Sequence, residues 1–315
     1  MSGTPADLGR LLVVLGPTAS GKSALGIELA RRLGGEVLLC DSTQVFRHFD
    51  IGTAKTPVRE QQGVPHHLTD LVEPDQLFTA GEYRRRALGV LADLETRRKL
   101  PILTAGTGLY LRALLEGLAE APERSEDLRR RLDRKADRRG AEYLHRLLTR
   151  LDAEAAARIA RRDRQKVIRA IEIRVLAKKS VGEVHRAGRD ALQGYEITKI
   201  GLAPARSALY LRIKERTGSM IARGWVGEVR DLLAAGVLPN AKPFEFIGYS
   251  ELRDHLAGKI GLDEAVRRIE QSTRQFAKRQ MTWFRREKDV HWLAGFGDDA
   301  NIQNQALEIA ENRRH

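Results

Sequence analysis

The sequence predicts an α/β protein, with a P-loop-type parallel sheet core flanked by helices and an all-helical insertion domain. Apolar runs with strand character alternate with helical patterns, which is typical of a parallel sheet. The first apolar run leads directly into the letters GPTASGKS. Between residues 122 and 193, in contrast, only helical spacing occurs. We therefore expect a core made of residues 1–121 and 194–315, and a helical insertion of residues 122–193.

The first element in chain order is a buried strand, expected from the uninterrupted apolar run over residues 11–15. A helix-forming run over 24–33 follows and ends at Gly34 and Gly35. Further apolar runs predict strands at residues 36–41, 101–108 and 196–204. Apolar residues at helical spacing predict helices throughout the insertion and at residues 81–99, 209–223, 225–235 and 263–286.

The segment after the first strand has the spacing G-x-x-x-x-G-K-S of a phosphate-binding loop. Its glycines let backbone N–H groups turn toward phosphate oxygens, Lys22 adds a positive charge, and the Ser23 hydroxyl is a candidate ligand of Mg²⁺. The helix that follows points its N-terminus at the anion. The residues predicted to bind phosphate are Gly16, Pro17, Thr18, Ala19, Ser20, Gly21, Lys22 and Ser23.

Two further polar segments follow predicted strands. The letters DSTQ begin at Asp41, after the second strand, and the letters GTG around Thr107 follow the third. Because ligands of an open parallel sheet bind beyond the carboxyl ends of its strands, both segments are expected to face the same crevice as the phosphate loop. Asp41 could act there as a magnesium ligand or as a general base.

Charge and composition narrow the choice of partners. The chain of 315 residues has a net charge of +13, and residues 122–193 contain 21 Lys and Arg against 12 Asp and Glu. Such an excess favours a nucleic acid partner over a merely solvated basic surface. The aromatic content of 5% argues against a stacking platform for single strands. One cysteine, Cys40, and the absence of a signal-peptide pattern or a long apolar run indicate a cytoplasmic protein without membrane contact.

Motifs of the usual nucleotide-binding proteins are missing. The sequence has no N-K-x-D guanine-reading motif, and no second apolar strand ends in Asp at the distance typical of an ATPase. These observations do not exclude a P-loop kinase that acts on a small molecule.

Six segments along nearly the whole chain resemble the tRNA dimethylallyltransferase family, also called tRNA isopentenyltransferase. They are GPTASGKS, DSTQVFRHFDIGTAK (41–55), VPHHLTD (64–70), GTGLYLRALLEGL (106–118), IGYSEL (247–252) and TRQFAKRQMTWFRR (273–286). The resemblance implies that the loop holds dimethylallyl diphosphate, and that the dimethylallyl group passes to N6 of adenosine 37, beside the anticodon of tRNA. A sibling family prenylates free AMP or ADP. Its bacterial members lack the basic helical insertion, so residues 122–193 favour tRNA.

The resemblance also implies catalytic roles. Asp41 would be the general base that accepts the proton of the adenine amine. Thr107 would hydrogen-bond the bridging oxygen of the diphosphate, and Arg216 would add a second cation beside Lys22. Mg²⁺ on Ser23 would help to stabilise the leaving diphosphate. We expect the enzyme to act as a monomer.

Contacts with the tRNA anticodon stem-loop are implied at the DSTQ segment, in the insertion and at two later stretches. The implied residues are Asp41, Ser42, Thr43, Gln44, Thr107, Arg129, Gln165, Lys166, Val167, Ile168, Arg169, Glu245, Phe246, Ile247, Gly248, Tyr249, Ser250, Lys278, Arg279, Gln280, Met281, Thr282, Trp283, Phe284 and Arg285. Glu245 and Ser250 differ from the basic or glutamine residues that the family usually has there. His66 and His67 lack further ligands at metal spacing and are expected to hydrogen-bond within a loop.

Overall fold

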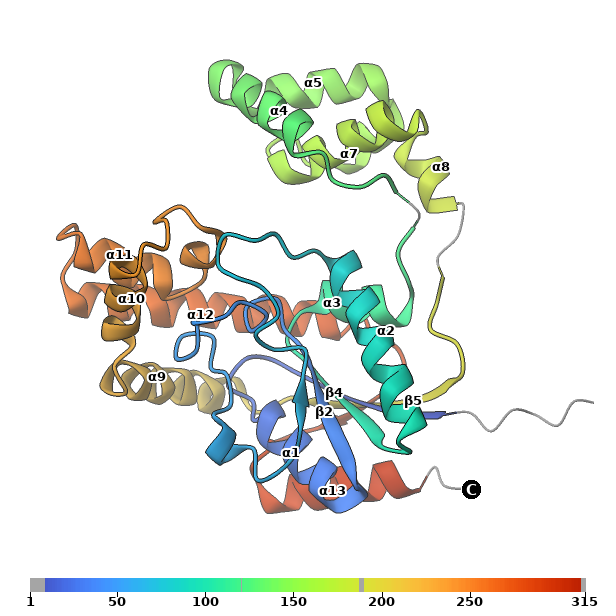
Figure 1. The fold of residues 1–315 in the computed structure, drawn as a ribbon, viewed down its shortest axis with the longest axis vertical. Coiled ribbons are helices and arrows are strands. Elements are labelled where there is room, and N and C mark those ends of the chain that lie inside the picture. Colours follow the sequence, from blue (N-terminus) through green and yellow to red (C-terminus); the bar gives the residue numbers. More distant parts are fainter. Residues whose placement is uncertain (1–8, 120, 187–189, 313–315) are drawn as a thin grey trace, which may run out of the picture. The chain divides into compact units, whose positions relative to one another are not determined.

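A parallel sheet organises the core in the computed structural model, which describes residues 9–119, 121–186 and 190–312. Within those residues the sheet has the strand order β3-β2-β4-β1-β5-β6, and each neighbouring pair is parallel (Figure 1). The strands are β1 (Gly9–Leu15), β2 (Gly35–Cys40), β3 (His66–His67), β4 (Leu100–Ala105), β5 (Tyr195–Leu202) and β6 (Val290–Leu293). This architecture confirms the predicted fold class.

Because of the strand register, the loops that follow β1, β2 and β4 begin at the same edge of the sheet. Leu15, at the end of β1, pairs with Ala105, at the end of β4. Cys40, at the end of β2, also pairs with Ala105. The segments that follow these three strands therefore leave the sheet side by side, at the edge where open parallel sheets bind ligands.

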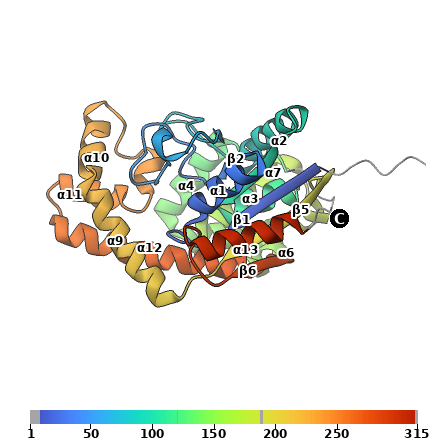
Figure 2. The same ribbon diagram turned by 90° about the horizontal axis from the view of Figure 1, so that it is seen from below.

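Helices cover both faces of the sheet. Leu25 of α1 and Ala306 of α13 pack with Val14 in one buried cluster, so these two helices cover one face (Figure 2). Leu11 and Val13 alternate to the other face, where α2 contacts β4. The helices of the core are α1 (Lys22–Leu33), α2 (Ala80–Thr96), α3 (Gly108–Leu115), α9 (Arg206–Ala222), α10 (Trp225–Ala234), α11 (Tyr249–Leu256), α12 (Leu262–Phe284) and α13 (Ala300–Glu311).

Four of these helices form a group next to the sheet. Helix α9 follows the end of β5 after a short connection, and α12 contacts both α9 and α11. Helix α10 joins the group through α9 and α11, as Figure 1 shows in gold and orange. The short 3-10 helix η2 (Lys242–Glu245) connects α10 to α11, and a second one, η1 (Val58–Glu60), lies between β2 and β3. Because α9 begins at the carboxyl edge of the sheet, its side chains can reach the loops that leave that edge.

A second compact unit spans residues 115–192. Its helices are α4 (Glu126–Arg139), α5 (Ala141–Leu151), α6 (Ala153–Arg158), α7 (Arg164–Ala177) and α8 (Val181–Arg186), drawn in green in Figure 1. Leu132 of α4, Leu144 and Leu148 of α5, and Val167 and Ile171 of α7 form its buried core. These leucines and isoleucines recur at helical spacing, which explains why the sequence reads as helical throughout.

Some short elements are not predicted by the sequence. Strands β3 and β6 have two and four residues, too short for a strand pattern to stand out. The expectation of a loop at His66 and His67 is wrong, because both residues form β3. Their side chains do make hydrogen bonds, His66 Nδ1 to Val64 O at 2.9 Å and His67 Nε2 to Glu36 at 2.7 Å. Among the described helices, none is both long and apolar enough to cross a membrane.

Candidate active site

The phosphate-binding loop leaves β1 at Gly16 and enters α1 at Lys22. Gly16 and Gly21 have φ angles of 151° and 86°, which side chains rarely tolerate. A Cβ at Gly21 would also lie 2.7 Å from the backbone nitrogen of Gly297, whose N–H donates to Ser20 O at 2.9 Å. Position 21 therefore needs glycine, because the segment after β6 packs directly against the loop and leaves no room for a side chain.

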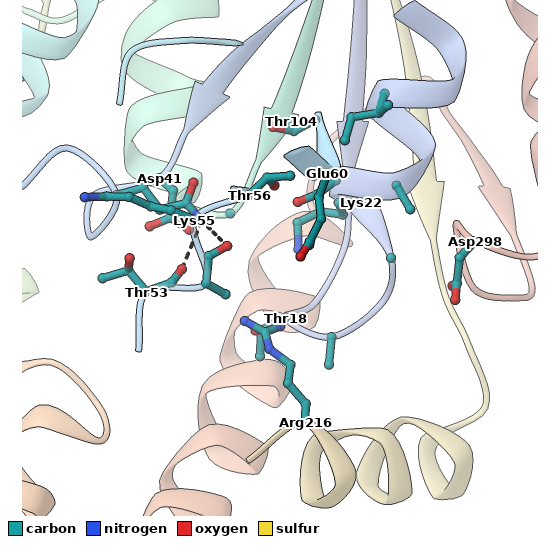
Figure 3. A pocket seen from close by; sticks show the side chains of 18 of the residues that line it. Thr18, Lys22, Asp41, Thr53, Lys55, Thr56, Glu60, Thr104, Arg216 and Asp298 are labelled. Atoms are coloured by element: carbon teal, nitrogen blue, oxygen red, sulfur yellow. Dashed lines mark hydrogen bonds between the residues drawn. The ribbon is translucent and has the colours of Figure 1, made fainter. Parts of the chain in front are cut away.

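Two cations, Lys22 and Arg216, face the loop. Lys22 Nζ donates to Pro17 O at 2.8 Å, and Arg216 donates to Thr18 Oγ1 at 3.3 Å (Figure 3). The pKa of Lys22 falls to about 8, chiefly because the group is buried; Asp41 opposes this shift and Arg216 adds to it. Burial also lowers the pKa of Arg216. Two half-buried cations beside the loop form a site that an anion would stabilise.

Asp41 lies beside this loop with one carboxylate oxygen engaged. Its Oδ1 accepts hydrogen bonds from the backbone N–H of Thr43 at 2.9 Å and from the Thr43 hydroxyl at 2.7 Å. A Cβ at Gly106 would lie 2.4 Å from Asp41 Oδ2, so the absence of a side chain makes room for this oxygen. Oδ2 has no hydrogen-bond partner within the described residues, which leaves it available to a ligand.

Thr107 is tied to the segment that carries Asp41. Its hydroxyl oxygen accepts from the Ser42 N–H at 2.9 Å and its hydroxyl donates to Ser42 Oγ at 3.2 Å. Gln44 is held in a similar way, because its side-chain amide donates to the carbonyls of Thr53 and Ala54 at 3.0 and 3.3 Å. The Thr107 loop and the DSTQ segment therefore form one hydrogen-bonded unit.

Two adjoining cavities meet at these groups. A polar cavity of about 800 Å³ is lined by Lys22, Ser23, Asp41 and Arg216, and Figure 3 shows Lys22 between Asp41 and Asp298, with Thr18 and Arg216 below. A second cavity of about 320 Å³ also reaches Thr18, Asp41 and Arg216, as well as Thr107. Its apolar walls are Ile213, Met220, Trp225, Phe246, Ile247, Ile269 and Phe276. Asp41 thus borders both a polar and an apolar space.

The side chains present fit Mg²⁺ bound through a substrate. The Ser23 hydroxyl is exposed and lines the polar cavity. Among the described residues, no group of three or more His, Cys, Asp or Glu side chains could hold a metal ion alone. Mg²⁺ commonly takes few protein ligands and completes its shell with substrate phosphates and water. A lone hydroxyl beside a phosphate loop suits that mode.

Some of the predicted tRNA-contacting residues of helix α12 lie on the surface, and others lie in the interior. Lys278, Arg279 and Thr282 are exposed and, with Trp283, line a shallow groove of about 390 Å³. Arg285 is exposed as well. Met281 and Trp283 are half-buried, and Gln280 and Phe284 are buried. The outer face of the helix is therefore basic, and its inner face belongs to the core.

The stretch from residue 245 to 250 is mostly part of the framework. Glu245 pairs with Lys242, while Phe246 and Ile247 line the apolar cavity. Gly248 has a φ of 93°, and a Cβ there would lie 1.9 Å from the Trp225 ring. The Tyr249 ring is buried and its hydroxyl donates to Glu228 at 2.6 Å, whereas Ser250 Oγ donates to Glu251 at 2.7 Å.

In the helical unit, two arginines that the resemblance assigns to tRNA make internal ion pairs. Arg129 and Arg169 both pair with the fully buried Glu172, at 2.9 and 2.6 Å. Val167 and Ile168 are buried in the helical core. Gln165 and Lys166 are exposed. Of these residues, Gln165 and Lys166 are the most accessible to a partner.

Several residues of the site escape sequence reasoning. The side chains of Thr53, Met220 and Phe276 line the cavities. Thr53 and Phe276 lie in segments that resemble the family but carry no implied role, and Met220 lies outside those six segments. Thr43 was expected only as a tRNA contact, and its hydrogen bonds to Asp41 could have been anticipated, because an Asp two residues before a Thr often accepts the backbone N–H of that Thr. The link from Gln280 to the phosphate loop spans 262 positions in the chain and has no local signal.

Fold and site together define the class of the protein: a P-loop α/β enzyme whose anion site, carboxylate and apolar cavity share one edge of a parallel sheet. The sequence pattern of the family described as IPP transferase matches residues 44–287, and the chain belongs to this family of prenyltransferases. The resemblance expected from the motifs is thereby confirmed.

Similar proteins with known names or solved structures support this family assignment. The chain is 51% identical to a tRNA dimethylallyltransferase of Koribacter versatilis, over 95% of this chain and 97% of that protein. It is 49% identical to the enzyme of the same name from Solibacter usitatus, with the same coverage of each chain. The crystal structure of a tRNA isopentenylpyrophosphate transferase from Bacillus halodurans has a TM-score of 0.69 and 34% identity, covering 97% of this chain and 99% of that one. A eukaryotic dimethylallyltransferase acting on tRNA shares the fold, with a TM-score of 0.82 at 24% identity, over 97% of this chain and 80% of that one.

Proposed function

We propose that the protein transfers a dimethylallyl group from dimethylallyl diphosphate to N6 of adenosine 37 in tRNA and releases diphosphate. The observation that carries this proposal is the position of Asp41, which borders both the polar cavity at the phosphate loop and the adjoining apolar cavity. A diphosphate in the first would place its prenyl group at the second. The names of the relatives at 51% and 49% identity support the same reaction.

The donor diphosphate would be held by the loop and two cations. Backbone N–H groups of the loop and the charges of Lys22 and Arg216 neutralise the oxygens that gain charge when the allylic C–O bond breaks. The Thr107 hydroxyl donates to the bridging oxygen, which requires it to turn from Ser42 Oγ. Mg²⁺ held by Ser23 and the diphosphate would add charge stabilisation of the leaving group.

The acceptor amine needs help because its lone pair is delocalised into the adenine ring. As the new N–C bond forms and the C–O bond to diphosphate breaks, the nitrogen loses one proton, and Asp41 Oδ2 accepts it. The hydrogen bonds from Thr43 to Oδ1 fix the carboxylate for this task. The target base must leave its stack to reach this position.

The apolar cavity would enclose the dimethylallyl group. Met220, Phe276 and Ile269 exclude water from the allylic carbon, which would otherwise be hydrolysed while it carries positive charge. The flipped base would enter this cavity of about 320 Å³ at its Asp41 end. Because water is excluded, the allylic carbon reacts with the adenine amine and is not hydrolysed.

The tRNA would be held by basic surfaces. Exposed basic residues such as Lys278 of α12 and Arg285, directly after that helix, contact phosphates together with exposed basic residues of the helical unit. These contacts set the position of the anticodon stem-loop. Gln44 lines the polar cavity together with Asp41, and we expect its side chain to contact the base. We expect the enzyme to work as a monomer in the cytoplasm.

Transfer of label decides between this function and its alternatives. Labelled dimethylallyl diphosphate is incubated with Mg²⁺ and one of three acceptors: an anticodon stem-loop with adenosine 37, the same stem-loop with guanosine 37, or AMP. We expect label in the adenosine stem-loop alone. Label in AMP would identify an adenylate isopentenyltransferase, and phosphate release from ATP without any prenyl donor would identify a kinase or NTPase.

A further inference from the structure

Gln280 of α12 lies where the phosphate loop and the loop after β4 come together. Its side chain is buried, with 6% of the residue exposed. The backbone N–H of Thr18 donates to Gln280 Oε1 at 2.7 Å, and Gln280 Nε2 donates to Gly106 O at 2.7 Å. One partner can only donate and the other can only accept, so they fix the orientation of the amide.

The two partners of Gln280 belong to opposite sides of the reaction. Thr18 is part of the loop for the leaving diphosphate, and its hydroxyl accepts a hydrogen bond from Arg216. Gly106 leaves the space that Asp41 Oδ2 occupies, and Thr107 follows it directly. A single planar amide therefore joins the site of the leaving group to the site of proton acceptance.

The helix that carries Gln280 also carries the basic groove. Lys278 and Thr282, two positions to either side, line that groove on the outer face. One turn further, Trp283 packs against Gly108, where a Cβ would lie 2.1 Å from the indole nitrogen. The guanidinium of Arg112 stacks on the Trp283 ring at 4.7 Å. A displacement of α12 would therefore move both the phosphate loop and the segment around Thr107.

We propose that Gln280 is a positioning residue that couples tRNA binding on α12 to diphosphate binding in the phosphate loop. The inference rests on the proposed function, in which both ligands occupy this site. A purely structural glutamine would stabilise the fold without linking the two affinities. Coupling, in contrast, is reciprocal: each ligand changes the affinity for the other by the same factor.

An equilibrium cycle measures this factor. The affinity of an anticodon stem-loop is determined with and without saturating inorganic diphosphate and Mg²⁺, for the wild type, Gln280→Met and Gln271→Met. Methionine keeps the length of glutamine but lacks both hydrogen-bonding groups. Gln271 is an exposed glutamine on the same helix and serves as the matched control. We expect diphosphate to change stem-loop affinity by about fivefold or more in the wild type and the control, and by less than about twofold in Gln280→Met.

A shorter amide gives a second variant if Gln280→Met does not fold. Gln280→Asn keeps the polarity but cannot reach both Thr18 and Gly106, so it should also lose the coupling. Undiminished coupling in a folded Gln280 variant, or no coupling in the wild type, would overturn the inference. The cycle needs no chemical turnover, so a failure to transfer the prenyl group would count against the proposed function and not against the coupling.

Discussion

At the scale of single residues, the site depends on two half-buried cations that line the polar cavity. Lys22 and Arg216 lie at a loop that has no anionic side chain of its own, and the neighbouring carboxylate of Asp41 accepts hydrogen bonds from Thr43 through Oδ1. The positions of Lys22, Asp41 and Thr107 follow from the rule that parallel strands end at one edge. The charge of Arg216, which also lowers the pKa of Lys22, comes from α9, which is distant in the sequence, so no local pattern predicts its contribution.

The lowered pKa of Lys22 predicts a pH-dependent affinity for the donor. In the free protein Lys22 loses its proton above a pH of about 8, and a bound diphosphate favours the charged form. We expect the Kd for dimethylallyl diphosphate to be constant below pH 8 and to rise by up to about tenfold per pH unit above it. Titration calorimetry between pH 6.5 and 10 measures this change.

The control for this pH dependence is Lys22→Met, which should bind more weakly and lose the inflection. The stability of the free protein should change in the opposite direction. Because the folded pKa lies below the ordinary value of 10.5, the charged form is disfavoured in the fold, and stability from this group rises between pH 8 and 10.5. An equal inflection in Lys22→Met would assign it to another group.

Substitution of Asp41 distinguishes between two roles for this residue, a general base and a metal ligand. Asp41→Asn keeps the size of the side chain and an oxygen that can accept from Thr43, but it cannot take up the amine proton. We expect kcat to fall by about 10²–10⁴ while the Mg²⁺-dependent affinity for dimethylallyl diphosphate stays within about threefold. Rapid-quench kinetics and calorimetry give the two values. Loss of Mg²⁺-dependent binding would instead make Asp41 a metal ligand.

At the scale of elements, the geometry of the site is set by the ends of the strands and by close contacts between loops. The long strands, α1, α2, α9 and α12 are predictable because their apolar periodicity extends over several turns or a complete buried run. Strand β3 has two residues and derives its pairing from β2, so its sequence carries no pattern of its own. Gln280 illustrates the same limit within the site, since its two partners come from β1 and β4 loops that only the fold brings together.

The contact between Gly106 and Asp41 gives a test at this scale. A methyl group in Gly106→Ala would overlap Asp41 Oδ2, which is the end of a side chain and can move away. We expect the variant to fold, to bind diphosphate with unchanged affinity, and to lose about tenfold or more in kcat because the base is displaced. Gly89→Ala, at a position with open space on α2, is the matched control. Wild-type turnover in Gly106→Ala would show that Oδ2 is not the proton acceptor.

At the scale of the whole molecule, basic charge is concentrated in the helical unit but is not all available. The 21 basic residues between 122 and 193 include Arg129 and Arg169, which are engaged with the buried Glu172. Composition predicts the helices and the excess charge, but it cannot tell a paired arginine from an exposed one. Removal of Arg129 would leave Glu172 short of a partner and destabilise the unit, so weaker tRNA binding would not identify a contact.

A stripe on α4 offers a better test of tRNA binding. Arg130, Arg134 and Arg138 recur every fourth residue, are exposed, and form no ion pair within the described residues. Their replacement by Ala should reduce the slope of log K against log salt for an anticodon stem-loop by about 0.7–0.9 per contact. The affinity for dimethylallyl diphosphate should not change. Arg158→Ala, at a side chain paired with Glu154, is the control, and an unchanged slope in the triple variant would exclude this face.

The closure of the phosphate loop by Gly297 has a consequence for the order in which the protein matures. The loop is translated early, but Gly297 lies after β6, the strand of the described sheet that leaves the ribosome last. Until that segment has emerged, Ser20 lacks its backbone partner and α1 lacks the packing of α13. A nascent chain therefore carries the phosphate-binding motif without a finished binding site. We therefore expect the phosphate site to form only after the segment around Gly297 has been translated and can contact the loop after β1.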